Sequence, residues 1–394
     1  MILRNETKVN SRRCFAANPS LDQLPSPLPT APSVCDRSSL SRARADWQFA
    51  QTAFRRGCAR VLLLATYLIT GIAGFVGSAL ARALLERGDS VRGVDNFSTG
   101  RRENLAGIQD KIDLREADLN DAQAMATACK AADYILHQAA IPSVPRSVTD
   151  PISSNHANVN GTLTLLVAAR DAARRDGRPK RIIYAASSSA YGDQPTLPKH
   201  EGMIPQPISP YAVSKLTGEY YMQSFHRVYG LETVALRYFN IFGPRQDPSS
   251  PYSGVLAKFI PAMLRGESPT IYGDGEQSRD FTYVDNAVLA NLVACEAPAT
   301  NVAGQVFNVA CGGRFSLNQT FELLKKLTGF RGDAIHGQER SGDIKHSLAD
   351  ISLAKKYLGY TVLVGFEEGL RRTVAWYREV MLRSGELRTP VEAK

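Results

Sequence analysis

The sequence lacks the cysteine and histidine patterns of a disulfide framework or a zinc site. None of its six cysteines forms a CxxC pair with another, and no cluster of His and Cys has the spacing of zinc ligands. Scattered single thiols are typical of proteins from a reducing compartment. We therefore expect a cytoplasmic protein whose chemistry needs no metal.

The sequence also has no concentrated basic surface, although its formal net charge is +9. Residues 1–60 contain ten Lys or Arg against four Asp or Glu, so this short segment accounts for +6 of that charge. The longer remainder carries only +3 and shows no basic stripe interleaved with aromatic side chains. A nucleic-acid partner is therefore not expected.

One uncharged run of 21 residues, Val61–Ala81, is long enough to cross a membrane. It contains glycines at positions 71, 74 and 77 and continues into the amphipathic run Ala79–Arg87. A buried strand, a glycine turn and the start of a helix give the same hydropathy. We favour this globular interpretation and expect no membrane association.

Residues 1–60 differ from the rest of the chain. Four prolines fall within Leu21–Ser33, the flanking segments are rich in Ser and Arg, and no apolar core of a signal peptide follows Met1. Such a composition cannot bury enough apolar surface to offset the loss of chain entropy on folding. We expect a disordered extension here. The alternative is that translation of the native protein begins near Val61 and that residues 1–60 are not part of it.

From residue 61 onward, apolar strands alternate with helical stretches, which is typical of a doubly wound parallel sheet of the Rossmann type, an α/β fold. Strands are expected at Tyr67–Thr70, Ser90–Asp95, Asp133–Ala139, Arg181–Ala186 and Thr233–Phe239, with helices such as Asn158–Arg175 and Tyr211–Tyr229 between them. Later elements are expected at Val255–Arg265, Thr270–Tyr272, Asn286–Cys295, Gln305–Asn308, Ser316–Leu327 and Glu367–Val380. We expect a sheet domain at residues 61–243, to which some later elements return, and a smaller C-terminal substrate lobe at 244–394.

A glycine-rich turn follows the first strand. The glycines at 71, 74 and 77 have the spacing GxxGxxG, which lets backbone N–H groups and the helix N-terminus approach a pyrophosphate. Asp95 ends the next strand, where its carboxylate can accept hydrogen bonds from ribose hydroxyls and repel a 2′-phosphate. The pattern predicts NAD in preference to NADP, with the nearby Arg101 and Arg102 as a contrary indication. Asp118 fits either a contact to the adenine or a solvated loop acid.

A tyrosine and a lysine lie one helical turn apart. Ser209 and Pro210 form a good N-cap and first position for a helix that begins at Tyr211, so Tyr211 and Lys215 share one face. A free tyrosine has a pKa near 10 and is a poor base at neutral pH. The lysine ammonium on the same face, together with a positive nicotinamide ring, would stabilise its phenolate, so we expect a lowered pKa and an acid/base role for Tyr211.

Three serines, Ser187, Ser188 and Ser189, end an apolar strand 24 residues before Tyr211. Ligands bind at the carboxyl ends of strands in this architecture. A hydroxyl there can share the proton that moves between Tyr211 and a substrate hydroxyl. A polar turn is the alternative for the same residues.

Together these residues resemble the extended short-chain dehydrogenase/reductase family, and within it the nucleotide-sugar 4-epimerases, closest to the UDP-N-acetylglucosamine 4-epimerase group. The resemblance covers about residues 66–380. It is carried by the motifs TGIAGFVGS, VDNFSTG, LHQAA, NVNGT, YAASSSAYGD, SPYAVSK, LRYFNIFGPRQ, GDGEQSRDFTYV and ERSGDIKHSLADIS. It implies a UDP-sugar substrate, inversion at C4 through a 4-keto sugar, a recycled NAD and a homodimer.

The resemblance also implies roles for individual residues. The catalytic set would be Ser187, Tyr211 and Lys215. Cofactor contacts would be Gly71, Gly74, Phe75, Val76, Gly77, Asp95, Asn96, Asp118, Leu119, Gln138, Ala139, Ala140, Asn158, Tyr211, Lys215 and Tyr238. Substrate contacts would be Ser188, Ser189, Asn240, Arg279, Arg340, Asp343 and Ser347.

Two departures from related enzymes narrow the reaction and the sugar. Related dehydratases and decarboxylases place an acid in the serine segment, whereas this chain has Ser188, Ser189 and Ala190 there. The resemblance places Ser347 at a position where epimerases restricted to UDP-glucose and UDP-galactose have a bulky aromatic residue. A serine there would leave room for an N-acetyl group beside the sugar C2. UDP-glucose or UDP-glucuronate epimerisation is the alternative activity, and a non-catalytic NAD-binding protein is the alternative class.

Overall fold

The computed structural model describes residues 64–387 except 179, 249–253 and 340–343. The expectations for residues 1–60 therefore lie outside the described residues. Thr66–Ala81 is divided into a strand, a turn and the start of a helix, as the globular interpretation of the uncharged run predicts. No helix among the described residues is long and apolar enough to cross a membrane.

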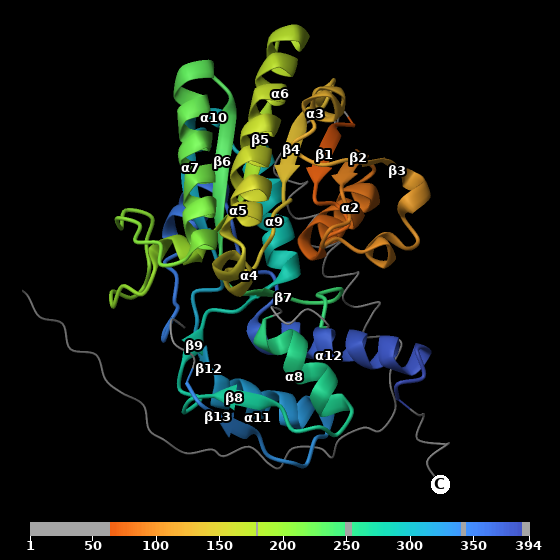
Figure 1. Ribbon diagram of the computed structural model, residues 1–394, viewed down its shortest axis with the longest axis vertical. Coiled ribbons are helices and arrows are strands. Elements are labelled where there is room, and N and C mark those ends of the chain that lie inside the picture. The colour runs from red at the N-terminus through yellow and green to blue at the C-terminus, as the bar shows by residue number, and fades with distance from the viewer. Residues whose placement is uncertain (1–63, 179, 249–253, 340–343, 388–394) are drawn as a thin grey trace, which may run out of the picture. The chain divides into compact units, whose positions relative to one another are not determined.

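Seven parallel strands form the central sheet, in the order β11-β6-β5-β4-β1-β2-β3 (Figure 1). Their bounds are β1 (Thr66–Thr70), β2 (Ser90–Asp95), β3 (Ile112–Glu116), β4 (Tyr134–His137), β5 (Arg181–Ser187), β6 (Glu232–Tyr238) and β11 (Gln305–Val309). The strand order reverses between β1 and β4, and ligands of such sheets bind at the carboxyl ends of the strands beside that point. The predicted doubly wound parallel sheet is confirmed.

Helices cover both faces of the sheet, which explains why its strands read as nearly continuous apolar runs. Packed on one face are α3 (Ala122–Cys129), α6 (Gly161–Asp176) and α7 (Pro210–Tyr229), and on the other α2 (Phe75–Arg87) and α9 (Val284–Glu296). Leu68, Ile135 and Ile182 lie side by side in the register of β1, β4 and β5, and all three are fully buried in the core beneath α3 and α6.

The predicted element bounds agree with the structure to within a few residues, and the differences within the sheet and its covering helices concern β4, α6, β3 and α3. The strand expected at Asp133–Ala139 is the shorter β4. The helix expected at Asn158–Arg175 begins as a π-helical turn, His156–Asn160, before α6. β3 and α3 were not predicted, because the half-buried edge strand Ile-Asp-Leu-Arg-Glu has no apolar run and α3 has only two turns.

Among the described residues, helices and short strand pairs from the C-terminal part of the chain lie beyond the carboxyl ends of the sheet (Figure 1). We refer to them as the C-terminal lobe. The helices α8 (Val255–Leu264), α11 (Leu317–Thr328) and α12 (Phe366–Arg383) pack on one another. The strand pairs are β7 (Ile241–Phe242) with β10 (Thr282–Tyr283), β8 (Thr270–Tyr272) with β13 (Ile335–Gly337), and β9 (Ser278–Arg279) with β12 (Phe315–Ser316). Shorter helices are α4 (Val144–Thr149), α5 (Pro151–Asn155) and α10 (Ala299–Val302).

Candidate active site

A cavity of about 970 Å³ lies at the carboxyl ends of β1, β2, β4, β5 and β6, with the C-terminal lobe contributing part of its wall. It brings together nearly all of the residues that sequence reasoning selected. The predicted site residues in its lining are Gly71, Gly74, Phe75, Val76, Gly77, Asp95, Asn96, Asp118, Leu119, Gln138, Ala139, Ala140, Ser187, Ser188, Ser189, Tyr211, Lys215, Tyr238, Asn240, Arg279 and Ser347.

The glycine turn is shaped by close backbone contacts. Gly71 has a φ of +69°, and a Cβ added to it would lie 2.7 Å from the Cα of Ala139. A Cβ on Gly77 would collide with the carbonyl oxygen of Gly71. α2 begins after Gly74 with no side-chain cap and no acidic residue in its first turn. Its first N–H groups therefore lack partners within the helix and face a cavity that suits an anion.

The Asp95 carboxylate is fixed at the end of β2. It accepts hydrogen bonds from the backbone N–H groups of Ala73 and Phe97, each at 2.8 Å. It is 7% exposed, and burial raises its pKa even though both hydrogen bonds oppose that change. A Cβ on Gly100 would lie 2.7 Å from the carboxylate, so only glycine keeps this side of the carboxylate open.

Asp118 also lines the cavity and is held by amide donors. Asn96 donates to it at 2.7 Å and the Asn120 side chain at 2.8 Å. Burial acts to raise the pKa of Asp118, but these hydrogen bonds outweigh burial and the pKa is lowered. An ionised carboxylate therefore stands beside the predicted adenine end of the cavity.

The two arginines after β2 differ in position. Arg102 pairs with Glu116 at 2.5 Å, lies 3.9 Å above the ring of Phe97 and is not part of the cavity lining. Arg101 does line the cavity, where its guanidinium lies 2.8 Å from Asp247. The charge of Arg101 is thus already matched by a carboxylate, which weakens the indication that these arginines bind a 2′-phosphate.

Tyr211 and Lys215 lie on α7 as predicted. Ser209 caps the helix by accepting from the N–H of Ala212, and Pro210 occupies the first turn. The Tyr211 N–H donates to the hydroxyl of Ser147 on α4 at 3.0 Å, which fixes the start of α7 against the cavity wall. Lys215 is 3% exposed, and its Nζ donates to the Ala185 carbonyl of β5 at 2.8 Å.

Burial dominates the protonation of this pair. It raises the pKa of Tyr211, against a hydrogen bond with Ser187 that lowers it. Burial also lowers the pKa of Lys215 to about 7, although the charge of Glu219 opposes this. The expected lowering of the Tyr211 pKa is therefore not produced by the described protein groups alone, because desolvation of the phenolate outweighs the single hydrogen bond.

The serine turn presents hydroxyls to the same cavity. Ser187 ends β5, and its Oγ accepts from both the N–H and the hydroxyl of Ser189, at 3.2 and 2.9 Å. Ser187 also lowers the pKa of Tyr211, so the serine turn and the tyrosine act on each other within the cavity. No carboxylate stands at positions 188 to 190, so no acid from this turn enters the cavity.

One predicted cofactor contact lies behind the cavity wall. Asn158 is 1% exposed and is not part of the lining. Its amide oxygen accepts from the Ile141 N–H at 2.8 Å, and its amide nitrogen donates to the Ser214 hydroxyl at 3.0 Å. The structure therefore gives Asn158 a supporting role between the loop after β4 and α7, because its polar atoms are used within the protein.

The predicted substrate contacts are only partly described. Arg279 Nη1 donates to the carbonyl groups of Ser278 and Lys345, at 3.0 and 3.1 Å, and Ser347 N–H donates to the Ser278 carbonyl at 3.0 Å. These bonds bring the segment around Ser347 to the edge of the cavity. The predicted contacts Arg340 and Asp343 lie outside the described residues.

Sequence reasoning missed some of the residues around the cavity. Arg146 lines it from α4, directly before Ser147, which holds Tyr211. Asn291 on α9 is fully buried and donates to the Tyr238 hydroxyl at 2.7 Å, while Tyr238 donates to the Gln138 amide oxygen at 3.1 Å. Arg146 lies in the stretch Val-Pro-Arg-Ser at 144–147, and Asn291 follows the stretch Asp-Asn-Ala at 285–287. Neither stretch has a residue spacing that indicates these contacts.

Comparisons with known proteins agree with this geometry. The pattern of the NAD dependent epimerase/dehydratase family matches residues 67–310. The UDP-N-acetylglucosamine 4-epimerase of Methanobrevibacter ruminantium, solved with UDP-N-acetylmuramic acid, is 42% identical with a TM-score of 0.76, and the match covers 81% of this chain and 100% of that one. The UDP-glucose 4-epimerase of Thermotoga maritima, solved with UDP-glucose, is 38% identical with a TM-score of 0.75 over 80% and 99% of the two chains.

A third solved structure carries the cofactor. The UDP-glucuronic acid 4-epimerase of Bacillus cereus, solved with UDP-glucuronic acid and NAD, is 30% identical to this chain. Its TM-score is 0.73, and the match covers 80% of this chain and 99% of that one.

Proposed function

The chain belongs to the NAD dependent epimerase/dehydratase family and is an NAD-dependent nucleotide-sugar 4-epimerase, and within that activity we propose that it interconverts UDP-N-acetylglucosamine and UDP-N-acetylgalactosamine. The observation that carries the choice of sugar is Ser347, a small side chain at the edge of the cavity. The likeness to the epimerase of Methanobrevibacter ruminantium supports the same choice.

The cavity fits NAD. The N-terminus of α2 offers the N–H groups of Phe75, Val76 and Gly77 to a pyrophosphate, and the Asp95 carboxylate keeps acceptor capacity for ribose hydroxyls. Asp118 and Asn96 would border the adenine, and Gln138 and Tyr238 the other half of the cofactor. When bound, NAD supplies the acceptor for the hydride of sugar C4 and a positive charge near the reacting atoms.

The protein itself moves and holds the proton. Tyr211, assisted by Ser187, takes the proton from the sugar O4 hydroxyl and later returns it to O4, after C4 has been reduced from its opposite face. The Lys215 ammonium, one turn away, stabilises the Tyr211 phenolate that accepts this proton. Arg279 would hold the diphosphate while the 4-keto sugar turns, since a guanidinium suits phosphate oxygens. Both Tyr211 and Lys215 line the cavity, which supports a catalytic protein over a non-catalytic NAD-binding one.

A second sugar has one observation in its favour. Arg146 lines the cavity next to Ser147, which contacts the start of α7, and its guanidinium would attract the carboxylate of a UDP-glucuronate. A panel of UDP-sugars, analysed for C4 epimers, separates the two candidates. We expect kcat/KM for UDP-N-acetylglucosamine to exceed that for UDP-glucose and UDP-glucuronate. A preference for either of the latter sugars would refute the choice based on Ser347.

We also propose a cytoplasmic homodimer that pairs through α6 and α7. α7 leaves Val213, Tyr220 and Val228 about half or more exposed, and Ile152 on the neighbouring α5 is 81% exposed. Apolar side chains gathered on adjoining helices are typical of a surface that a second copy covers. Light scattering after size exclusion tests this, and a monomer at micromolar concentration would refute it.

A further inference from the structure

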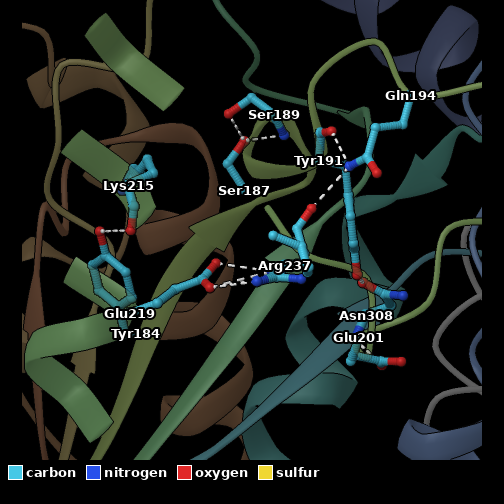
Figure 2. Close-up of polar contacts among 11 residues, drawn as sticks. Tyr184, Ser187, Ser189, Tyr191, Gln194, Glu201, Lys215, Glu219, Arg237 and Asn308 are labelled. Atoms are coloured by element: carbon cyan, nitrogen blue, oxygen red, sulfur yellow. Dashed lines mark hydrogen bonds and ion pairs between the residues drawn. The ribbon is translucent and has the colours of Figure 1, made fainter. Parts of the chain in front are cut away.

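A buried ion pair lies directly behind the lysine of the active site. Glu219 follows Lys215 by four residues on α7, so both side chains lie on one face of the helix. Glu219 is 1% exposed and Arg237 on β6 is 4% exposed. Arg237 grips both carboxylate oxygens, with Nε at 3.0 Å from one and Nη2 at 2.7 Å from the other (Figure 2).

The arginine is itself fixed from its far side. Arg237 lies opposite Ala186 in the register of β6 and β5, next to the position where Ser187 lies opposite Tyr238. Its guanidinium carbon is 4.6 Å from the ring centroid of Tyr191, and the Tyr191 hydroxyl donates to Asn308 of β11 at 2.7 Å (Figure 2). The carboxylate of Glu219 is therefore held rigidly on the side of Lys215 away from the cavity.

The other groups around Lys215 bring no negative charge. His137 on β4 has its pKa lowered to about 3 by burial, so it is neutral, and both its ring nitrogens are hydrogen-bonded to threonines, Thr70 and Thr162. Tyr184 on β5 has its ring centroid 5.0 Å from Nζ, and burial raises its pKa well above 10. Among the described residues, Glu219 is the one carboxylate whose charge acts on Lys215.

We propose that Glu219 is a positioning residue for the reaction, whose Arg237-bound carboxylate keeps Lys215 protonated beside Tyr211. The inference rests on the proposed function of the same site. Burial raises the pKa of Glu219, and the hydrogen bonds and charge of Arg237 oppose this rise and favour the carboxylate. The Glu219 carboxylate in turn favours the ammonium form of Lys215. If the Glu219–Arg237 ion pair only joined α7 to β6, it would contribute to stability and would leave the protonation of Lys215 unchanged.

The sign of the effect follows from the charges. Burial already brings the pKa of Lys215 to about 7, and the anion next to it opposes a further fall. In Glu219→Gln the uncompensated Arg237 cation would lower the pKa of Lys215 further. The ammonium would then be lost at lower pH, and with it the support for the Tyr211 phenolate.

The test is the pH profile of kcat for Glu219→Gln with the UDP-sugar that the wild type epimerises fastest. We expect the alkaline limb to move down by about one pH unit and kcat above it to fall about tenfold, while KM stays within about twofold. An unshifted alkaline limb overturns the proposal, whatever happens to the melting temperature.

The matched control is Glu232→Gln. Glu232 pairs with Arg181 at 2.5 Å across the same two strands, β6 and β5, but at their amino ends, away from the cavity. We expect this variant to lose stability and to keep the wild-type pH profile. If both variants shift the profile equally, the effect reports a loosened sheet and the proposal fails. If Glu219→Gln does not fold, the apolar pair Glu219→Leu with Arg237→Met removes both partners of the ion pair, so neither is left as an unmatched buried charge. This double variant still deprives Lys215 of its carboxylate, and its profile is judged by the same criterion.

A second readout does not depend on turnover. Trace acetylation of Lys215 by acetic anhydride, followed on its peptide by mass spectrometry over a pH series, measures the pKa of this lysine directly. A lower pKa in Glu219→Gln than in wild type supports the proposal even if no UDP-sugar is epimerised, in which case only the proposed function fails. Equal pKa values in the two proteins overturn the proposal even if epimerisation is confirmed.

Discussion

Lys215 is held at the active site at a cost in stability, and the substitution Lys215→Met should reveal it. The methylene stem of the lysine fits a buried position on α7, but its charged end makes one hydrogen bond, to the Ala185 carbonyl, and is 3% exposed with the rest of the side chain. Methionine is similar in length and brings no charge into this site. We expect the variant to be inactive and more stable than the wild type.

The magnitude follows from the pKa of Lys215. Burial lowers it to about 7 from its ordinary value of 10.5, a difference that favours the unfolded chain by about 5 kcal/mol at or below pH 7. Methionine gives up the hydrogen bond to Ala185, which is worth about 1 kcal/mol. We expect a net gain of about 2 to 4 kcal/mol at pH 7, or roughly 3 to 8 °C in Tm for a chain of this size.

The stability that Lys215→Met gains over the wild type should decrease as the pH rises. Between about pH 7 and 10.5 the folded wild type binds fewer protons than the unfolded chain, because the pKa of Lys215 is lower in the folded state. Wild-type stability therefore rises with pH in this window, by up to about 1.4 kcal/mol per pH unit from Lys215. The advantage of the methionine variant should be greatest near pH 7 and should largely vanish near pH 10.

Thermal unfolding of the cofactor-free proteins over this pH range is the assay, since bound NAD would add its own contribution to Tm. Lys180→Met is the control, because Lys180 is equally buried but lies 2.6 Å from Asp176 and loses an ion pair on substitution. We expect Lys180→Met to be destabilised. The reasoning is refuted if Lys215→Met is also destabilised, or if its gain does not change with pH.

Three further substitutions test the site. Tyr211→Phe should lower kcat at least about a thousandfold in steady-state kinetics, because it removes the hydroxyl that moves the proton. Because the ring is kept, the free energy of unfolding measured with urea should change by at most about 1 kcal/mol. Appreciable residual turnover would argue for another base. Ser347→Tyr should shift the ratio of kcat/KM for UDP-N-acetylglucosamine over UDP-glucose at least about tenfold toward UDP-glucose, and an unchanged ratio would remove Ser347 from the choice of sugar. Gly77→Ala should weaken NAD binding at least about tenfold by calorimetry, because the new Cβ collides with the carbonyl oxygen of Gly71 that shapes the turn; unaltered affinity would mean that the turn adapts.

The local pattern of the sequence determined the strands of the sheet other than β3, and it determined the parts of the site that lie on single elements. An apolar run interrupted by glycines predicts strand, turn and helix, and the structure explains two of these glycines, since backbone atoms leave no room for a Cβ at Gly71 and Gly77. The spacing of Tyr211 and Lys215 after a serine and a proline predicts one helix face, and the structure has that helix with that cap. These features depend on contacts within a few residues, so the sequence by itself contains them.

Contacts between distant segments were decided only by the tertiary structure. Asn158 appears in a motif beside cofactor contacts, yet its amide is used up by Ile141 and Ser214 behind the wall. In the edge strand β3, apolar and polar residues do not form a pattern clear enough to predict a strand, because its side chains are only partly buried.

Glu219 and Arg237 are 18 residues apart, and only the packing of α7 on β6 makes them a buried pair. Burial in that packing also sets the protonation of the site, since desolvation raises the pKa of Tyr211 and lowers that of Lys215. A sequence names the groups that can titrate, but the solvent excluded around each group, which fixes its pKa, exists only in the folded chain.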